Sequence, residues 1–146
     1  MSAALKIHRI THLLYRAGLQ QTARAISRVS QVVFGAVLPP EAIIGDGTEL
    51  GYGGMGVVVH KDSIIGRNVL LSPGVVIGGR SEKAGVPVIE DDAKIGAGAK
   101  ILGPIRIGAG AKIGANAVVL HDVAPGDTVA GVPARPIRAT AKLKVA

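Results

Sequence analysis

An aliphatic residue recurs at every sixth position through the middle of the chain, and this spacing constrains the fold more than any other feature. The series runs from Val59 to Val119 with one break at Lys83, which preserves the register because Ile77 and Ile89 are twice six residues apart. Its members are Val59, Ile65, Leu71, Ile77, Ile89, Ile95, Ile101, Ile107, Ile113 and Val119. A period of six fits neither an α-helix, which repeats every 3.6 residues, nor a long flat strand, which repeats every two. It is typical of a solenoid of short strands and tight turns.

Small residues accompany this ladder at fixed places. A Gly often follows the aliphatic residue directly, as in Ile65-Gly66 and Ile95-Gly96, and a small or β-branched residue usually stands four positions after it. A strand that turns its aliphatic side chain inward and ends in a Gly corner makes one side of a coil, because Gly tolerates backbone angles that a Cβ forbids. Because a core this narrow buries little apolar surface, we expect a partner chain to add stability.

The repeat divides the chain into three parts. We predict an N-terminal helical segment over residues 1–37, a β-helix over 38–134 with loop insertions near 51–58 and 78–87, and a basic C-terminal tail over 135–146. Two apolar stripes at helical spacing mark the first part, and we expect them to pack against the first coil or a neighbouring subunit. These stripes are Ile7, Ile10, Leu14 and Ala17, then Ile26, Val29 and Val33. Insertions in solenoids tend to gather on the binding face, so the two loops are where we look for chemistry.

Composition excludes several classes of protein. The chain has no Cys, so disulfides, thiolate metal ligands and a catalytic thiol are all excluded. The formal net charge of +7 comes from the two ends, since residues 1–40 carry five basic residues and no acidic one. No aromatic residues interleave with these charges to stack on bases, which argues against nucleic acid as a partner. No apolar run is long enough to span a membrane, and without a secretory signal pattern we expect a cytoplasmic protein.

The order of the motifs resembles one family. The stretch from Glu90 to Ile137, with IGAGAKI, KIGANA and AGVPARP in sequence, resembles the end of the serine O-acetyltransferases in the hexapeptide-repeat acyltransferase superfamily. The start, HRITHLLYRAG followed by LPPEAIIGDGTELGYGGMGVVVH, resembles the helix and first coil of the same family, in a short form that lacks the longer N-terminal helical domain. The resemblance implies a left-handed parallel β-helix, a homotrimer, and acetyl-CoA bound as co-substrate between adjacent subunits, with no metal.

The resemblance also implies a reaction, the transfer of an acetyl group from a thioester to the hydroxyl of a small acceptor. An alcohol is a poor nucleophile at neutral pH, so such an enzyme needs a general base, most often His. His60 is the candidate base, because it follows the inward-facing Val59 at a corner that Gly usually fills, and Tyr52 in the adjacent insertion is the second catalytic candidate. We expect His8 and His12 to be packing residues on a helix, and His121 to lie in a turn near the last coil.

The positions that match acetyl-CoA contacts are better preserved than those for the acceptor. By resemblance, the cofactor-binding residues are Gly79, Gly96, Ala97, Lys112, Ala115 and Arg135. Family members carry an Asp-His pair where this chain has Gly51-Tyr52, an Arg-His pair where it has Gly85-Val86, and an Asp where it has Val37. The sequence therefore leaves two classes of acceptor: serine or a related small alcohol, or a sugar hydroxyl in polysaccharide biosynthesis.

Two other functions fit the same fold. One is a trimeric metalloenzyme of the carbonic anhydrase type, which needs three converging His ligands, whereas only His60 and His121 lie in the coils. The other is a non-catalytic trimeric β-helix module, either for assembly or derived from an enzyme that has lost its acceptor site. Stabilisation by coenzyme A separates the enzyme from the non-catalytic module.

Overall fold

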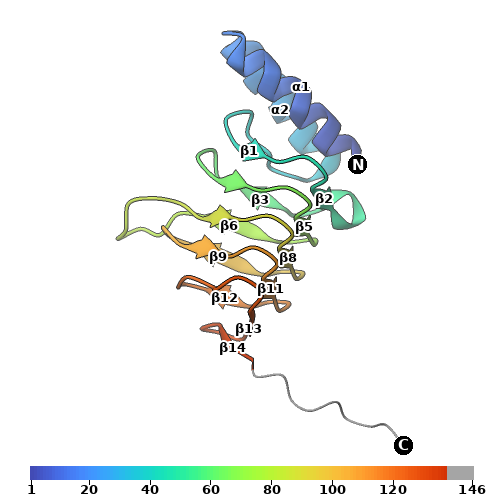
Figure 1. Cartoon of the computed structure of the whole chain (residues 1–146). Coiled ribbons are helices and arrows are strands. Elements are labelled where there is room, and N and C mark those ends of the chain that lie inside the picture. Colours follow the sequence, from blue (N-terminus) through green and yellow to red (C-terminus); the bar gives the residue numbers. More distant parts are fainter. Residues whose placement is uncertain (138–146) are drawn as a thin grey trace, which may run out of the picture.

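The computed structural model describes residues 1–137. Two helices, α1 (Ala3–Arg16) and α2 (Gln20–Phe34), form an antiparallel hairpin that covers one end of a stack of β-coils (Figure 1). The side chain of Ser2 caps α1 by accepting a hydrogen bond from the backbone N–H of Leu5, and Gly35 ends α2 in the left-handed conformation, which costs Gly little. No helix among the described residues is long and apolar enough to cross a membrane.

The coils are built from short strands in three parallel sheets. Sheet I contains β3 (Val58–Val59), β6 (Val76–Gly78), β9 (Lys100–Leu102) and β12 (Val118–Val119). Sheet II contains β1 (Ile43–Ile44), β4 (Ile64–Ile65), β7 (Val88–Ile89) and β10 (Arg106–Ile107). Sheet III contains β2 (Glu49–Leu50), β5 (Leu70–Leu71), β8 (Lys94–Ile95), β11 (Lys112–Ile113) and β13 (Thr128–Ala130), and ends with the antiparallel β14 (Arg135–Pro136). The predicted left-handed parallel β-helix with a helical N-terminal segment is confirmed.

The predicted ladder is the core of the coils. Each of its ten aliphatic residues is buried, and like residues stack in register, with Ile65 paired to Ile89 and Leu71 to Ile95. The residues four positions further on are buried as well, except the exposed Ser81 in the excursion, and most of them are Ala or Val. Dispersion contacts between stacked aliphatic side chains, together with the removal of their surface from water, hold successive coils together.

The two insertions lie at different corners of the coil. On every coil a turn joins sheet III to sheet I. We call this set of turns the Tyr52 corner, because its first member contains Tyr52 in the 3-10 turn η1 (Gly51–Gly54). The turns that join sheet I to sheet II form the His60 corner. His60 lies in the first of these turns, and the excursion over residues 79–87 replaces the turn of the next coil. In Figure 1 this excursion is the loop between β6 and β7 that extends away from the stack. Both insertions are absorbed within a corner, so the strands on either side keep their register.

The buried face of the helical hairpin does not coincide with the two predicted apolar stripes, and packing of these stripes against a neighbouring subunit stays a prediction. The buried face of α1 consists of Ala4, Leu5, His8 and Thr11, and the only buried residue of α2 is Ala23. The second predicted stripe does not pack against the first coil, since Val29 is 64% and Val33 is 65% exposed. The small Ala4, Thr11 and Ala23 among the buried residues permit close packing of the helices.

Two His side chains fix the hairpin to the first coil. The Nε2 of His8 lies 3.1 Å from the carbonyl oxygen of Pro39, and the Nδ1 of His12 lies 2.8 Å from that of Pro40. Both His therefore have packing roles, as the sequence indicated. Burial lowers the pKa of His8 from 6.5 to about 4, and its hydrogen bond to Pro39 offsets only part of that effect.

We expect His8 to make the fold less stable in mild acid. Because the folded pKa lies below the unfolded one, the unfolded chain binds the additional proton between pH 6.5 and about 4, and stability falls as the pH decreases through this range. Between pH 7.5 and pH 5 the loss attributable to His8 is about 2 kcal/mol. Urea unfolding of the wild type and of His8→Gln at both pH values measures this loss of unfolding free energy. The exposed His121→Gln is the control, and an equal pH dependence in wild type and His8→Gln would contradict the assignment.

Candidate functional site

His60 occupies the first turn of its corner and is held by its own backbone. Its N–H donates to the carbonyl of Ile77 on the next coil at 2.9 Å, and its carbonyl accepts from the N–H of Ser63. The imidazole Nδ1 accepts a hydrogen bond from the backbone N–H of Asp62 at 3.2 Å and lies 3.8 Å from the Asp62 carboxylate. The side chain is 37% exposed, so a ligand can reach the ring.

These contacts determine which tautomer can act as a base. When Nδ1 accepts the N–H of Asp62, the proton of the neutral ring is on Nε2, and Nε2 cannot accept another. When Nδ1 instead donates to the nearby Asp62 carboxylate, Nε2 is free to accept a proton from an alcohol. Asp62 is therefore the side chain that lies near enough to stabilise the second tautomer of His60. Sequence reasoning missed it, although the His-x-Asp spacing was visible.

Tyr52 lies in an unusual backbone conformation. Its φ of 49° and ψ of 38° are left-handed, a region that costs most residues with a Cβ about 1–2 kcal/mol. The other three non-glycine residues with positive φ are Asn68, Asp92 and Asn116, types that tolerate this region. The Tyr52 side chain is 94% exposed, and Met55 in the same insertion is 69% exposed. The corner thus presents an apolar, aromatic surface to solvent.

The structure does not bring the two catalytic candidates together within one chain. Tyr52 lies between β2 and β3, whereas His60 lies between β3 and β4, so one side of the coil separates them. A single subunit therefore cannot place both side chains on one small acceptor.

Three of the six predicted cofactor positions do come together. Gly96, Ala97 and Ala115 lie at the Tyr52 corner, on successive coils, and the N–H of Asn116 donates to the carbonyl of Ala97 at 2.8 Å. A Cβ on Gly96 would lie 2.7 Å from the backbone nitrogen of Ala115, so only Gly permits this spacing between coils. The corner is a row of small residues along which a ligand can approach the backbone closely.

The remaining three positions are distributed around the coil. Gly79 lies at the His60 corner, where the excursion begins. Lys112 is an exposed residue of β11 and is paired in register with Lys94. Arg135, where we predicted the basic tail to begin, lies in β14, and residues 138–146 of that tail fall outside the described part of the chain. Lys112 and Arg135 place two cations on the outer surface of sheet III, next to the row of small residues.

One further cation at the Tyr52 corner was not predicted. Lys100 is on β9 in sheet I, and its ammonium donates to the carbonyl of Gly74 at 2.9 Å. Gly74 lies in the turn of the Tyr52 corner that is one coil before the turn of Gly96 to Gly98. The ammonium of Lys100 therefore places a positive charge beside the row of small residues. Within residues 1–137 no three His, Asp or Glu side chains are grouped so that they could hold a metal ion.

Comparison with known proteins finds a family model and several relatives that this chain resembles. The model for bacterial transferase hexapeptide repeats (six repeats) matches residues 87–121. The serine acetyltransferase of Bacillus licheniformis is 46% identical over 134 residues, which is 90% of this chain and 62% of that protein. The serine acetyltransferase of Bacillus subtilis is 45% identical over 134 residues, covering 90% and 61%. The chain thus spans about three fifths of the length of these relatives.

Solved structures agree with the sequence comparison. A serine acetyltransferase from Brucella abortus strain S19 in complex with coenzyme A matches with a TM-score of 0.89 and 39% identity over 94% of this chain and 56% of that one. The soybean serine acetyltransferase complexed with serine matches with a TM-score of 0.87 and 43% identity, covering 92% and 56%. On sequence and fold together, the chain resembles serine acetyltransferases over about nine tenths of its own length, and residues 87–121 match the bacterial transferase hexapeptide model.

Proposed function

We propose that this protein is an acetyl-CoA-dependent O-acetyltransferase, which moves the acetyl group to a hydroxyl of a small acceptor. The observation that carries this proposal is the match of nearly the whole chain to serine acetyltransferases, one of them solved with coenzyme A. The row of Gly96, Ala97 and Ala115 supports it, because small residues let a flexible pantetheine arm lie against backbone groups. Lys112 and Arg135 are near enough to this row to meet the phosphates of the nucleotide.

The working assembly in this proposal is a homotrimer. One chain presents Gly79 and His60 at one corner and Tyr52, Gly96 and Ala115 at another. Packing the His60 corner of one subunit against the Tyr52 corner of its neighbour would place the residues of both corners on the same cleft. This arrangement also adds the buried surface that a narrow coil needs.

The acceptor we propose is serine or a related small alcohol, with a sugar hydroxyl as the second candidate. The first follows the named relatives, of which the soybean enzyme was solved with serine. The second is favoured by the exposed Tyr52, which stands where a family member's Asp-His pair would be and, with the nearby exposed Met55, suits the apolar face of a sugar ring. The cytoplasmic location remains a prediction from the sequence, which fractionation of the producing cells would test.

Two measurements test this function. Coenzyme A at millimolar concentration should raise the melting temperature of the wild-type protein, because a ligand that binds only the folded state stabilises it by mass action. Release of free thiol from acetyl-CoA should then be followed with serine, homoserine and nucleotide sugars as acceptors. Turnover on one of them establishes the acceptor. The absence of any coenzyme A stabilisation would contradict the enzyme and favour a non-catalytic module.

A further inference from the structure

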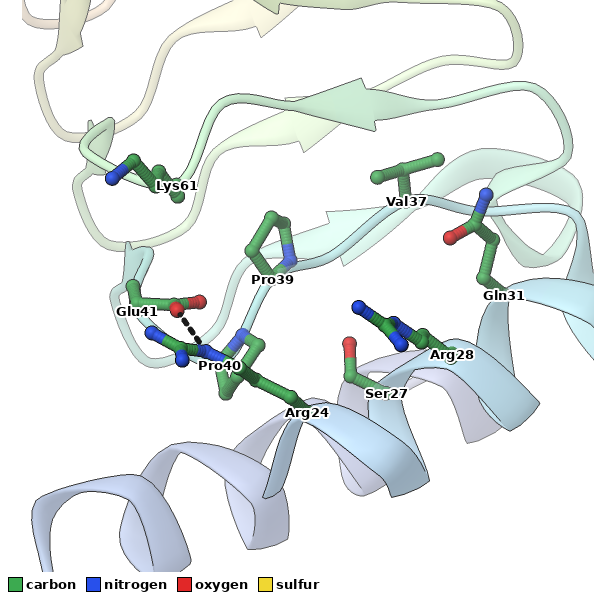
Figure 2. Close-up of a pocket in the computed structure, with 9 residues that line it drawn as sticks. All are labelled: Arg24, Ser27, Arg28, Gln31, Val37, Pro39, Pro40, Glu41 and Lys61. Carbon is green, nitrogen blue, oxygen red and sulfur yellow. Dashed lines mark hydrogen bonds and ion pairs between the residues drawn. The ribbon is translucent and has the colours of Figure 1, made fainter. Parts of the chain in front are cut away.

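A cavity of about 270 Å³ lies between α2 and the first coils, outside the row of small residues (Figure 2). We call it the hairpin pocket. Its lining residues are Arg24, Ser27, Arg28, Gln31, Val37, Pro39, Pro40, Glu41 and Lys61. Figure 2 shows Arg24, Ser27, Arg28 and Gln31 reaching in from α2, with Pro39, Glu41 and Lys61 across from them on the coil side.

Several hydrogen-bond acceptors of this pocket already have partners, although the side-chain amide oxygen of Gln31 accepts from no protein group within residues 1–137. The carbonyl of Val37 accepts from the N–H of Val59, and the carbonyls of Pro39 and Pro40 lie within hydrogen-bond distance of the two His rings of α1. The carboxylate of Glu41 accepts from the Nε of Arg24 at 2.9 Å. The two Pro residues contribute no N–H of their own. The pocket therefore offers a ligand few unoccupied acceptors.

Three of its side chains with donors, in contrast, lack protein partners. Within residues 1–137 the side chains of Arg28, Gln31 and Lys61 donate to no protein group. Ser27 directs its hydroxyl hydrogen to the carbonyl of Leu38 at 3.0 Å. With three cations and one carboxylate in the lining, the pocket has a net charge of +2. The donors without protein partners, all on exposed side chains, and the excess positive charge together favour an anion as the ligand.

The size of the pocket limits what that anion can be. At about 270 Å³ it lies just below the usual range of about 300–1,000 Å³ for drug-sized ligands, so it suits a small oxyanion and not a whole nucleotide cofactor. A guanidinium matches a phosphate oxygen pair in a bidentate arrangement, which a chloride ion cannot use. We propose that the hairpin pocket binds the phosphate group of a small phosphorylated ligand, with Arg28 as its main contact and Lys61 as the second.

The position of Lys61 connects this site to the reaction. Lys61 directly follows His60, so the hairpin pocket and the candidate base share one turn of the coil. Two sources of the phosphate fit this position. It can belong to the acceptor, so that the pocket orients a hydroxyl toward His60, or it can come from a separate effector that binds beside the site.

Direct binding of inorganic phosphate and pyrophosphate tests the site without relying on catalysis. Calorimetric titration at low salt should detect pyrophosphate binding to the wild-type protein. Arg28→Gln should weaken that binding roughly tenfold or more, the range expected for loss of a charge-assisted hydrogen bond, and a second change, Lys61→Gln, should weaken it further. Arg67→Gln is the matched control, since Arg67 is exposed on a different corner and loses the same charge. Arg28 is exposed, so its replacement should leave the melting temperature unchanged.

The outcomes are distinct from those of the acetyl-transfer assay. No binding by the wild type, or equal loss in Arg28→Gln and Arg67→Gln, would overturn the site whether or not the protein transfers acetyl groups. Once an acceptor is known, competition distinguishes the sources. Pyrophosphate that raises the KM for the acceptor at constant kcat assigns the pocket to the acceptor's own phosphate. Pyrophosphate that binds equally well with the acceptor present assigns it to an effector.

Discussion

Replacing His60 by Ala is expected to lower kcat for acetyl transfer by about 10²–10⁴, the usual contribution of a general base. The proposed reason is that the acceptor hydroxyl must lose its proton as it attacks the thioester, and His60 is the candidate base at the corner where the excursion leaves the coil. Thiol release at saturating acetyl-CoA and acceptor measures the effect. Because the ring is partly exposed, the substitution should change the melting temperature little.

A companion variant distinguishes a catalytic role of His60 from a structural one. Asp62→Asn keeps the backbone N–H that contacts Nδ1 but removes the carboxylate that would hold the active tautomer. It should lower kcat less than His60→Ala and shift the acidic limb of the pH profile, which a purely structural role would not do. Full activity in His60→Ala would show that His60 is not the base, and Tyr52 would then be the residue to replace.

Replacing Ile95 by Ala is expected to lower the free energy of unfolding by about 2–5 kcal/mol, as for other fully buried aliphatic residues. Ile95 is 1% exposed and is stacked between Leu71 and Ile113, so its loss leaves a void that touches three consecutive coils. The melting temperature should fall by at least about 5 °C. Protein concentration must be kept constant, because subunit association contributes to apparent stability.

The neighbouring residue supplies the control for this experiment. Lys94 is on the same strand but points outward, so Lys94→Ala should change the free energy of unfolding by less than about 0.5 kcal/mol. Similar losses in the two variants would mean that the ladder is not the source of cohesion between coils.

The coils could be predicted from the sequence because each ladder position is determined locally. An inward Ile95 followed by Gly96 requires only the alternation of a short strand and the sterics of a turn, and both are repeated many times. The insertions could also be recognised, since Lys83 breaks the ladder without shifting it.

What could not be predicted depends on packing between different parts of the chain. The sequence could not decide whether the stripe with Val29 and Val33 packs against the first coil or a neighbouring subunit, because a pair of helices on the end of a coil can be rotated in several ways with the same sequence period; in this chain the stripe does not face the coil. The hairpin pocket follows from that rotation, so Arg28 and Lys61 are close only in the folded chain. The five basic residues in 1–40, with no acid, were the only signal of it.

The corner insertions uncouple loop length from the core. Six additional residues leave the coil between β6 and β7, yet Ile65 and Ile89 still pair directly across that coil. A change of length or composition there alters what a ligand meets without moving any ladder residue. A β-helix of this kind can therefore exchange one acceptor loop for another during evolution, and the same property makes the excursion a suitable place to graft new specificity.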